Sequence, residues 1–129
     1  MDRDEGFLLK LDREDGGLEP GFYVKWEVMD DGELRLEDKI ILSMAMSYTG
    51  NGQEFYMSNQ VMSRKLSICI RTINNSIKTL ALLGYIRTFH KFPRDSNRMI
   101  GRTLEPAGKY RIKVKRDDNY IYKEYKFTI

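Results

Sequence analysis

The stretch SNQVMSRKLSICIRTINNSIKTLALLGYI, residues 58–86, determines the fold. It predicts one helix over 59–66, with the hydroxyl of Ser58 as its N-terminal cap, and a second helix over about 70–83 that ends at Gly84. Only three residues separate the two helices. Helices joined by so short a turn cannot lie side by side along their full length. We therefore expect them to cross steeply, as in a helix-turn-helix.

The helix over 70–83 has two chemically different sides. At about 100° per residue, its apolar residues collect on one side, which we assign to the core: Ile70, Ile73, Ile77, Leu80 and Ala81. The other side is polar and carries the candidate contacts Arg71, Thr72, Asn74, Asn75, Lys78 and Thr79. Arg, Asn and Lys side chains bind base edges and phosphates, and this side has no acidic residue to balance its charge. The pattern favours a nucleic-acid contact over a merely solvated face.

The sequence before this pair predicts a further helix and two strands. A helix over 36–48 is indicated by apolar residues at four-residue spacing: Leu36, Ile40, Met44 and Tyr48. Strands are expected over 7–11 and 22–28, with a loop at 12–21 between them. Alternation in the second strand places on one apolar face Phe22, Val24, Trp26 and Val28.

The sequence after Gly84 predicts two β-ribbons. A strand over 85–92, a turn rich in Pro, Asp, Ser and Asn, and a returning strand over 99–104 form a hairpin with arginines at its tip. A second ribbon is expected to pair 110–115 with 120–129.

This order of elements resembles the winged helix-turn-helix DNA-binding domains of plasmid and phage replication initiators, including replisome organisers, and of small bacterial transcriptional regulators. The resemblance covers about 34–92. The residues that carry it are Met57-Ser58-Asn59, Leu66 with Ile68, Arg71-Thr72-Ile73, Leu80 and Leu83-Gly84-Tyr85-Ile86. Arg35 and Cys69 stand where such domains commonly have Ser or Thr caps.

The resemblance implies an α+β fold, a winged helix-turn-helix with a three-helix core and a β-hairpin wing, plus additional N- and C-terminal β-strands. We expect three parts. Residues 1–33 form an acidic strand/loop extension, 34–104 the winged helix-turn-helix domain, and 105–129 a C-terminal β-ribbon that packs on the same domain.

The net charge of +3 conceals an asymmetry along the chain. Residues 1–38 hold five Lys/Arg against 13 Asp/Glu, a net charge of −8, whereas 39–129 hold 17 against six, a net charge of +11. Within 56–104, nine basic residues accompany a single acid, Asp95. A field of this sign attracts phosphate backbones.

The residues for catalysis or for a cofactor are sparse. One His and one Cys exclude a Cys/His zinc site within one chain, and Gly50-Asn51-Gly52 is interpreted as a helix stop, not a dinucleotide loop. The acidic pairs Asp30/Asp31 and Asp117/Asp118 adjoin turns, where Asp is favoured for backbone reasons. We therefore expect no enzyme activity, no cofactor and no metal.

We also expect no membrane association, since no apolar run reaches the 18 or more residues that a span needs. The single cysteine, Cys69, and the acidic start of the chain are typical of a cytoplasmic protein without a secretory signal.

The leading hypothesis is a protein that binds double-stranded DNA with helix 70–83 in the major groove. Arg71, Asn74, Asn75 and Lys78 contact bases or the backbone, and Arg64 and Lys65 are weaker phosphate candidates. On the wing, Arg94, Arg98 and Arg102 follow the backbone or the minor groove. The resemblance implies a role in replication initiation on mobile elements or in transcriptional regulation.

Two alternatives remain open at this point. In the first, the domain is a winged-helix protein-interaction module whose basic surface docks an acidic partner or the acidic leader 1–38. In the second, it is a plasmid-partition DNA-binding adaptor. The extra terminal strands also offer a homodimer surface, and a protein of a replication or transcription complex is a further candidate partner.

Overall fold

The computed structural model describes residues 6–12 and 18–128. The elements follow the chain in this order: β1 (Phe7–Asp12), β2 (Leu18–Val24), α1 (Trp26–Met29), α2 (Leu36–Gly50), α3 (Asn59–Leu66), α4 (Ile70–Leu82), β3 (Ile86–Pro93), β4 (Gly101–Pro106), a 3-10 turn (Gly108–Tyr110) and β5 (Tyr120–Tyr125). This is the α+β fold that the sequence predicts, a helix-turn-helix core with a β wing.

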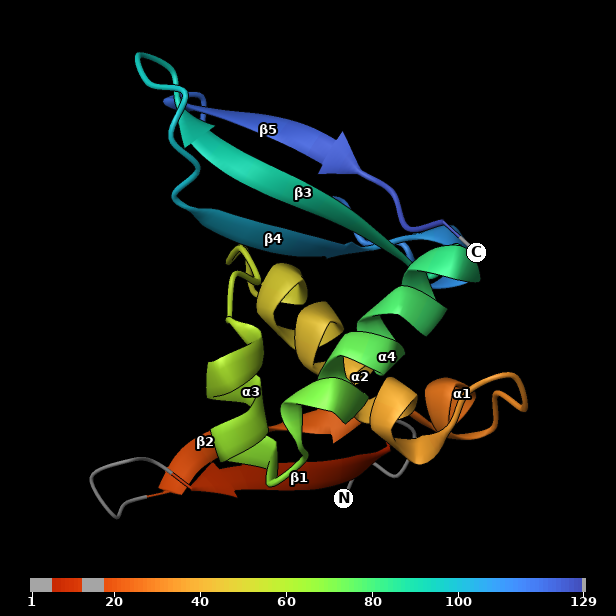
Figure 1. Cartoon of the computed structure of the whole chain (residues 1–129). Coiled ribbons are helices and arrows are strands. Elements are labelled where there is room, and N and C mark those ends of the chain that lie inside the picture. Colours follow the sequence, from red (N-terminus) through yellow and green to blue (C-terminus); the bar gives the residue numbers. More distant parts are fainter. Residues whose placement is uncertain (1–5, 13–17, 129) are drawn as a thin grey trace.

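The helices lie between two antiparallel sheets (Figure 1). One sheet pairs β1 with β2, and the other has the strand order β4-β3-β5. α2 contacts both sheets, through β2 and β4, and α4 packs against α2 and β3. α2 is therefore the element around which the other helices and both sheets assemble.

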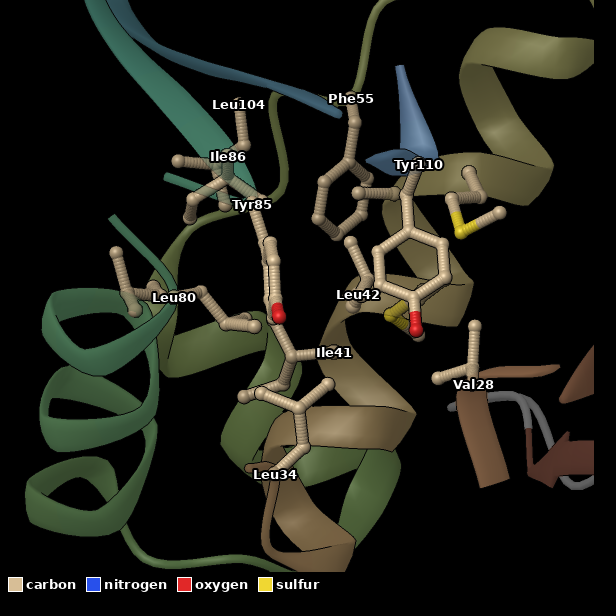
Figure 2. Packing of buried hydrophobic residues seen from close by; sticks show 14 of the residues in the cluster. Val28, Leu34, Ile41, Leu42, Phe55, Leu80, Tyr85, Ile86, Leu104 and Tyr110 are labelled. Carbon is tan, nitrogen blue, oxygen red and sulfur yellow. The ribbon is translucent and has the colours of Figure 1, made fainter. Parts of the chain in front are cut away.

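The core forms where α2 meets α4 and the wing strands. Ile41 and Leu42 from α2 meet Leu80 from α4 and Leu104 from β4, all of them buried (Figure 2). The α2 helix begins where the Asp38 carboxylate in its first turn accepts the backbone N–H of the cap residue Arg35 at 3.0 Å. This is the half of a capping box that does not require a Ser or Thr at the cap.

Leu36 is an exception to the predicted core face, since it is 56% exposed. It is the first residue of α2, and helical side chains tilt toward the helix N-terminus. Its side chain is therefore directed past the end of the helix, while the preceding Leu34 is buried at 6% exposure.

The predicted strand over 22–28 is wrong in its second half. β2 ends at Val24, and Trp26–Met29 form the short helix α1. Because a helical turn repeats every three to four residues, Val28 joins Val24 in the core, but Trp26 is turned outward and is 44% exposed. The predicted loop also ends earlier than expected, because β2 begins at Leu18; residues 13–17 of that loop lie outside the described residues.

The predicted second ribbon is also wrong. Residues 111–117 form neither helix nor strand, and β5 pairs with β3, from Thr88↔Tyr125 to Pro93↔Tyr120. β3 has a second edge that β4 does not use, and β5 occupies it. The chain before β5 is anchored by Tyr110, whose hydroxyl donates to Asp31 Oδ2 at 2.7 Å. The wing is thus one three-stranded sheet.

Across residues 6–12 and 18–128, none of the helices combines the length and the apolar composition that crossing a membrane requires.

Candidate nucleic-acid interface

The turn between α3 and α4 follows from local sequence. The Ser58 hydroxyl accepts the N–H of Val61 at 3.2 Å and begins α3 as predicted. α3 ends at Ser67, whose φ of 56° is left-handed and reverses the chain. The backbone is extended at Cys69, and α4 begins at Ile70. Three residues therefore connect the helices, as the sequence predicts.

The far end of α4 is closed by a Schellman motif. Tyr85 N–H donates to the Leu80 carbonyl at 2.9 Å, and Gly84 N–H donates to the Ala81 carbonyl at 3.1 Å. Gly84 has a φ of 82°, which a side chain disfavours. Because Tyr85 is buried and β3 starts at the next residue, the motif fixes the wing relative to α4.

The two faces of α4 separate largely as predicted. Ile73, Ile77 and Leu80 are buried, as is Ser76. The exposed side chains include the four that were expected to contact a ligand: Arg71, Asn74, Asn75 and Lys78. Thr72 and Thr79 are half-buried at the borders of this face.

Ile70 corrects the predicted core face of α4, since it is 42% exposed. Like Leu36, it is the first residue of its helix, and its side chain tilts back beyond the helix end. The apolar stripe on α4 therefore begins at Ile73.

Positive charge gathers on the helix pair. No Asp or Glu occurs from Phe55 through Arg94. α3 carries Arg64 and Lys65 in its last turn, where cations interact favourably with the negative end of the helix dipole. α4 carries Arg71 and Lys78. Within the described part of the chain, Lys78 has no ion-pair partner. The surface has the charge and the donors that a polyanion requires.

The wing tip is different, because its charges are balanced. The β3–β4 turn carries Arg94, Asp95 and Arg98, and it meets the turn before β5, where Arg94 Nε donates to the carbonyl of Asp118. Asp117 and Asp118 lie in that second turn. Figure 1 shows the tip projecting beyond the helices. Arg98 is exposed. Arg94 is exposed as well, but its side chain is hydrogen-bonded to the Asp118 carbonyl.

Arg102 does not lie where the sequence predicts. Its guanidinium is half-buried between β4 and α3, where Nη1 donates to Asn59 Oδ1 at 2.7 Å and Nη2 donates to the Met57 carbonyl at 2.9 Å. Burial lowers the pKa of its guanidinium, and among the described residues its buried Nε has no partner. The segment before α3 runs past β4, so Arg102 on β4 can reach it. These two bonds connect the wing strand to the start of α3.

Sequence reasoning missed the role of Asn59. This half-buried residue at the start of α3 accepts from Arg102 and donates through Nδ2 to Asn74 Oδ1 on α4. The partners are 43 and 15 residues away, so no local spacing pattern indicates the contact.

The described strands of the acidic leader lie away from the polar face of α4. β2 contacts α2, and β1 contacts α3. Phe22 and Val24 belong to the core, and Asp31 is held by Tyr110 and by Lys109 Nζ at 3.0 Å. Since Arg71 and Lys78 are exposed, β1 and β2 do not cover them.

Comparison with known proteins agrees with this geometry. Residues 32–86 match a family model described as a helix-turn-helix domain. No curated protein and no solved structure matches the chain. The matched segment runs from the residues before α2 through α3 and α4 to the first residue of β3. Residues 32–86 of this chain thus form a helix-turn-helix domain, a type that suggests DNA binding, within an α+β fold that adds a β wing.

Proposed function

We propose that this protein binds double-stranded DNA with α4 in the major groove. The observation that carries the proposal is the exposed face of α4, where two amides and two cations stand on the second helix of a helix-turn-helix. A major groove about 12 Å wide admits one helix, and Asn, Arg and Lys are the side chains that bond to base edges and phosphates there.

The contacts divide by chemistry. Asn74 and Asn75 are suited to base edges, and Arg71 near the start of α4 to a guanine edge or a phosphate. Lys78 is a phosphate contact, with Arg64 and Lys65 from α3 as further candidates.

Thr72 and Thr79 border the face and add hydroxyl contacts to the DNA backbone. On the wing, Arg98 contributes a secondary phosphate contact and Arg94 a weaker one, because the acids beside them offset their charge. Arg102 has no direct contact with DNA in this proposal.

A salt series on duplex DNA tests the proposal. Each lost phosphate contact should lower the slope of log affinity against log salt by about 0.9, so Lys78→Ala should bind more weakly and show a smaller slope. Arg71→Ala should reduce affinity as well. The measurement is fluorescence anisotropy with a labelled duplex at several salt concentrations.

Lys113→Ala is the matched control, because Lys113 is an exposed cation outside α3 and α4. It should leave both affinity and slope close to those of the unaltered protein. Equal behaviour of the Lys78, Arg71 and Lys113 variants would show that α4 does not contact DNA.

We further propose that DNA binding serves replication initiation or transcriptional regulation on a mobile element, without catalysis and without a cofactor. The resemblance of segments such as Met57-Ser58-Asn59 and Leu83-Gly84-Tyr85-Ile86 to initiators and small regulators supports this role. Within the described residues, β1 and β5 are edge strands, which fits a homodimer formed through the terminal strands. Selection of bound duplexes from a random pool would report paired half-sites if the protein acts as such a dimer.

A further inference from the structure

The orientation of one amide on the DNA-facing surface follows from hydrogen-bond chemistry. The two ends of an Asn amide have nearly the same shape and opposite hydrogen-bond roles, so the partners determine which way the amide is turned. An arginine side chain has only donors. Since Arg102 Nη1 lies 2.7 Å from one end of the Asn59 amide, that end is the oxygen Oδ1.

The orientation of Asn59 then fixes that of Asn74. The opposite end of Asn59 is the donor Nδ2, and it faces the Asn74 amide. The Asn74 atom that meets it must accept, so it is Oδ1. Asn74 Nδ2 is consequently the end turned away from Asn59.

The side chains that impose this order, Arg102 and Asn59, are restrained by their surroundings. Arg102 is half-buried and is held from a second direction by the Met57 carbonyl at 2.9 Å. Asn59 is half-buried at the first turn of α3, next to the Ser58 cap. The three side chains therefore link β4 to α3 and α3 to the exposed face of α4.

We propose that Arg102, acting through Asn59, fixes the Asn74 amide so that it presents hydrogen-bond donors to DNA and thereby favours guanine at the base it contacts. This inference rests on the proposed DNA binding. In the major groove guanine offers two acceptors, N7 and O6, whereas cytosine offers only the N4 donor. Adenine offers one of each, so it is intermediate. An unrestrained asparagine inverts its amide to suit any of these edges, but Asn74 loses its bond to Asn59 if it does so.

The Asn59→Asp variant tests the inference because it replaces the donor that faces Asn74 with an acceptor. The new carboxylate keeps its bond to Arg102 but has only acceptors, so the oxygen that faces Asn74 now requires a donor. The Asn74 amide should invert and present its carbonyl oxygen to DNA. Selection from a random duplex pool should then show guanine replaced by cytosine at one position of the site, with a change of about tenfold in the ratio of the two bases.

Asn59→Ala is the matched control, because it removes the restraint without reversing it. It should weaken the guanine preference at that same position and leave the other positions unchanged. Circular dichroism melting of each variant confirms the fold.

A second variant keeps the test decisive if Asn59→Asp does not fold. Asn74→Asp also presents an oxygen to DNA, so it should lose guanine and gain cytosine at that position. If Asn74 instead presents its carbonyl in the unaltered protein, Asn74→Asp should retain the original base.

The outcomes distinguish a protein that does not bind DNA from one that binds DNA without a fixed Asn74 amide. If the unaltered protein selects no sequence and shows no salt-dependent binding to duplex DNA, the proposed function is wrong. If it binds DNA and Asn59→Asp selects the same base at every position, the function stands and the inference is overturned.

Discussion

Asp31 shows how a single acidic residue of the leader contributes to the fold. Its carboxylate is buried and accepts hydrogen bonds from the Tyr110 hydroxyl at 2.7 Å and the Glu33 N–H at 3.0 Å, and Lys109 lies 3.0 Å away. Burial alone would raise the pKa of Asp31, but the bonds from Tyr110, Lys109 and Glu33 outweigh it, and the pKa is lowered from 3.8. The ionised form is therefore the one that the folded protein favours.

Asp31→Asn should destabilise the protein by about 1–2 kcal/mol at pH 7, because a carboxylate bonded to three donors is lost. A carboxyl whose pKa is lowered on folding stabilises the protein above its unfolded pKa, and that contribution disappears as the pH falls through the folded value. The difference between the two proteins should thus shrink below about pH 4 and vanish in stronger acid. Urea unfolding at pH 7 and at low pH measures it.

Asp30→Asn is the control for this prediction, because Asp30 is the exposed neighbour. It should be close to neutral at both pH values. A pH-independent loss in Asp31→Asn would mean that the carboxylate matters for packing and not for its charge.

Predictability at the residue scale depends on whether the partner is local. The Ser58 cap and the exposed side chains Arg71 and Lys78 follow from nearby residues, and their placement could be predicted. The bonds of Arg102 could not, since Asn59 and Met57 are distant in sequence and the guanidinium turns inward only because the chain before α3 runs beside β4.

The elements of the helix pair are predictable because the start of the first helix and the end of the second each have a local signal. Ser58 begins α3, and Gly84 ends α4 within a Schellman motif. α1 could not be predicted, because its four residues are too few to show the helical repeat of about 3.6 residues. The apolar residues at 22, 24, 26 and 28 fit an alternating strand equally well.

Gly84→Ala should destabilise the protein by about 1 kcal/mol, because a side chain at a φ of 82° strains the backbone. A Cβ there meets no atom within 4 Å, so the effect is one of backbone strain and not of a clash. Thermal unfolding of the variant measures the loss.

Gly50→Ala serves as the comparison, since Gly50 ends α2 without a positive φ and also has open space around its Cα. It should be neutral or slightly stabilising. Equal melting temperatures for the two variants would argue against strain at Gly84.

At the scale of the whole molecule, the described strands of the leader contribute to the core. β1 and β2 form their own sheet beneath the helices, and Phe22 and Val24 are 4% and 0% exposed (Figure 1). This arrangement favours a structural role for the leader over one in which it blocks the polar face of α4.

Phe22→Ala should therefore cost about 3 kcal/mol of unfolding free energy, while Tyr23→Ala, at a side chain 43% exposed, should cost little. Deleting residues 1–24 should lower the melting temperature without tightening DNA binding. The two measurements are calorimetry and anisotropy on the same samples. A truncated chain that keeps its melting temperature and binds DNA tenfold more tightly would show that the leader is inhibitory.

The pairing of β5 with β3 could not be predicted from the sequence. The sequence predicts a strand over 120–129, of which Tyr120–Tyr125 forms β5, and alternation over 110–115 makes the nearest segment its expected partner. β3 is preferred because its second edge is open and because the bond between Tyr110 and Asp31 holds the chain just before 111–117. Such competition between edges is decided by tertiary packing and not by local pattern.

The position of Cys69 has a practical consequence. It is the single cysteine of the chain, it is exposed, and it immediately precedes α4. The hydrogen bond with the Thr72 hydroxyl lowers the pKa of its thiol, which raises the thiolate fraction available to a maleimide or to a thiol-modified oligonucleotide. A fluorescent or cross-linking probe can thus be attached beside α4 in the native sequence, without first removing other cysteines.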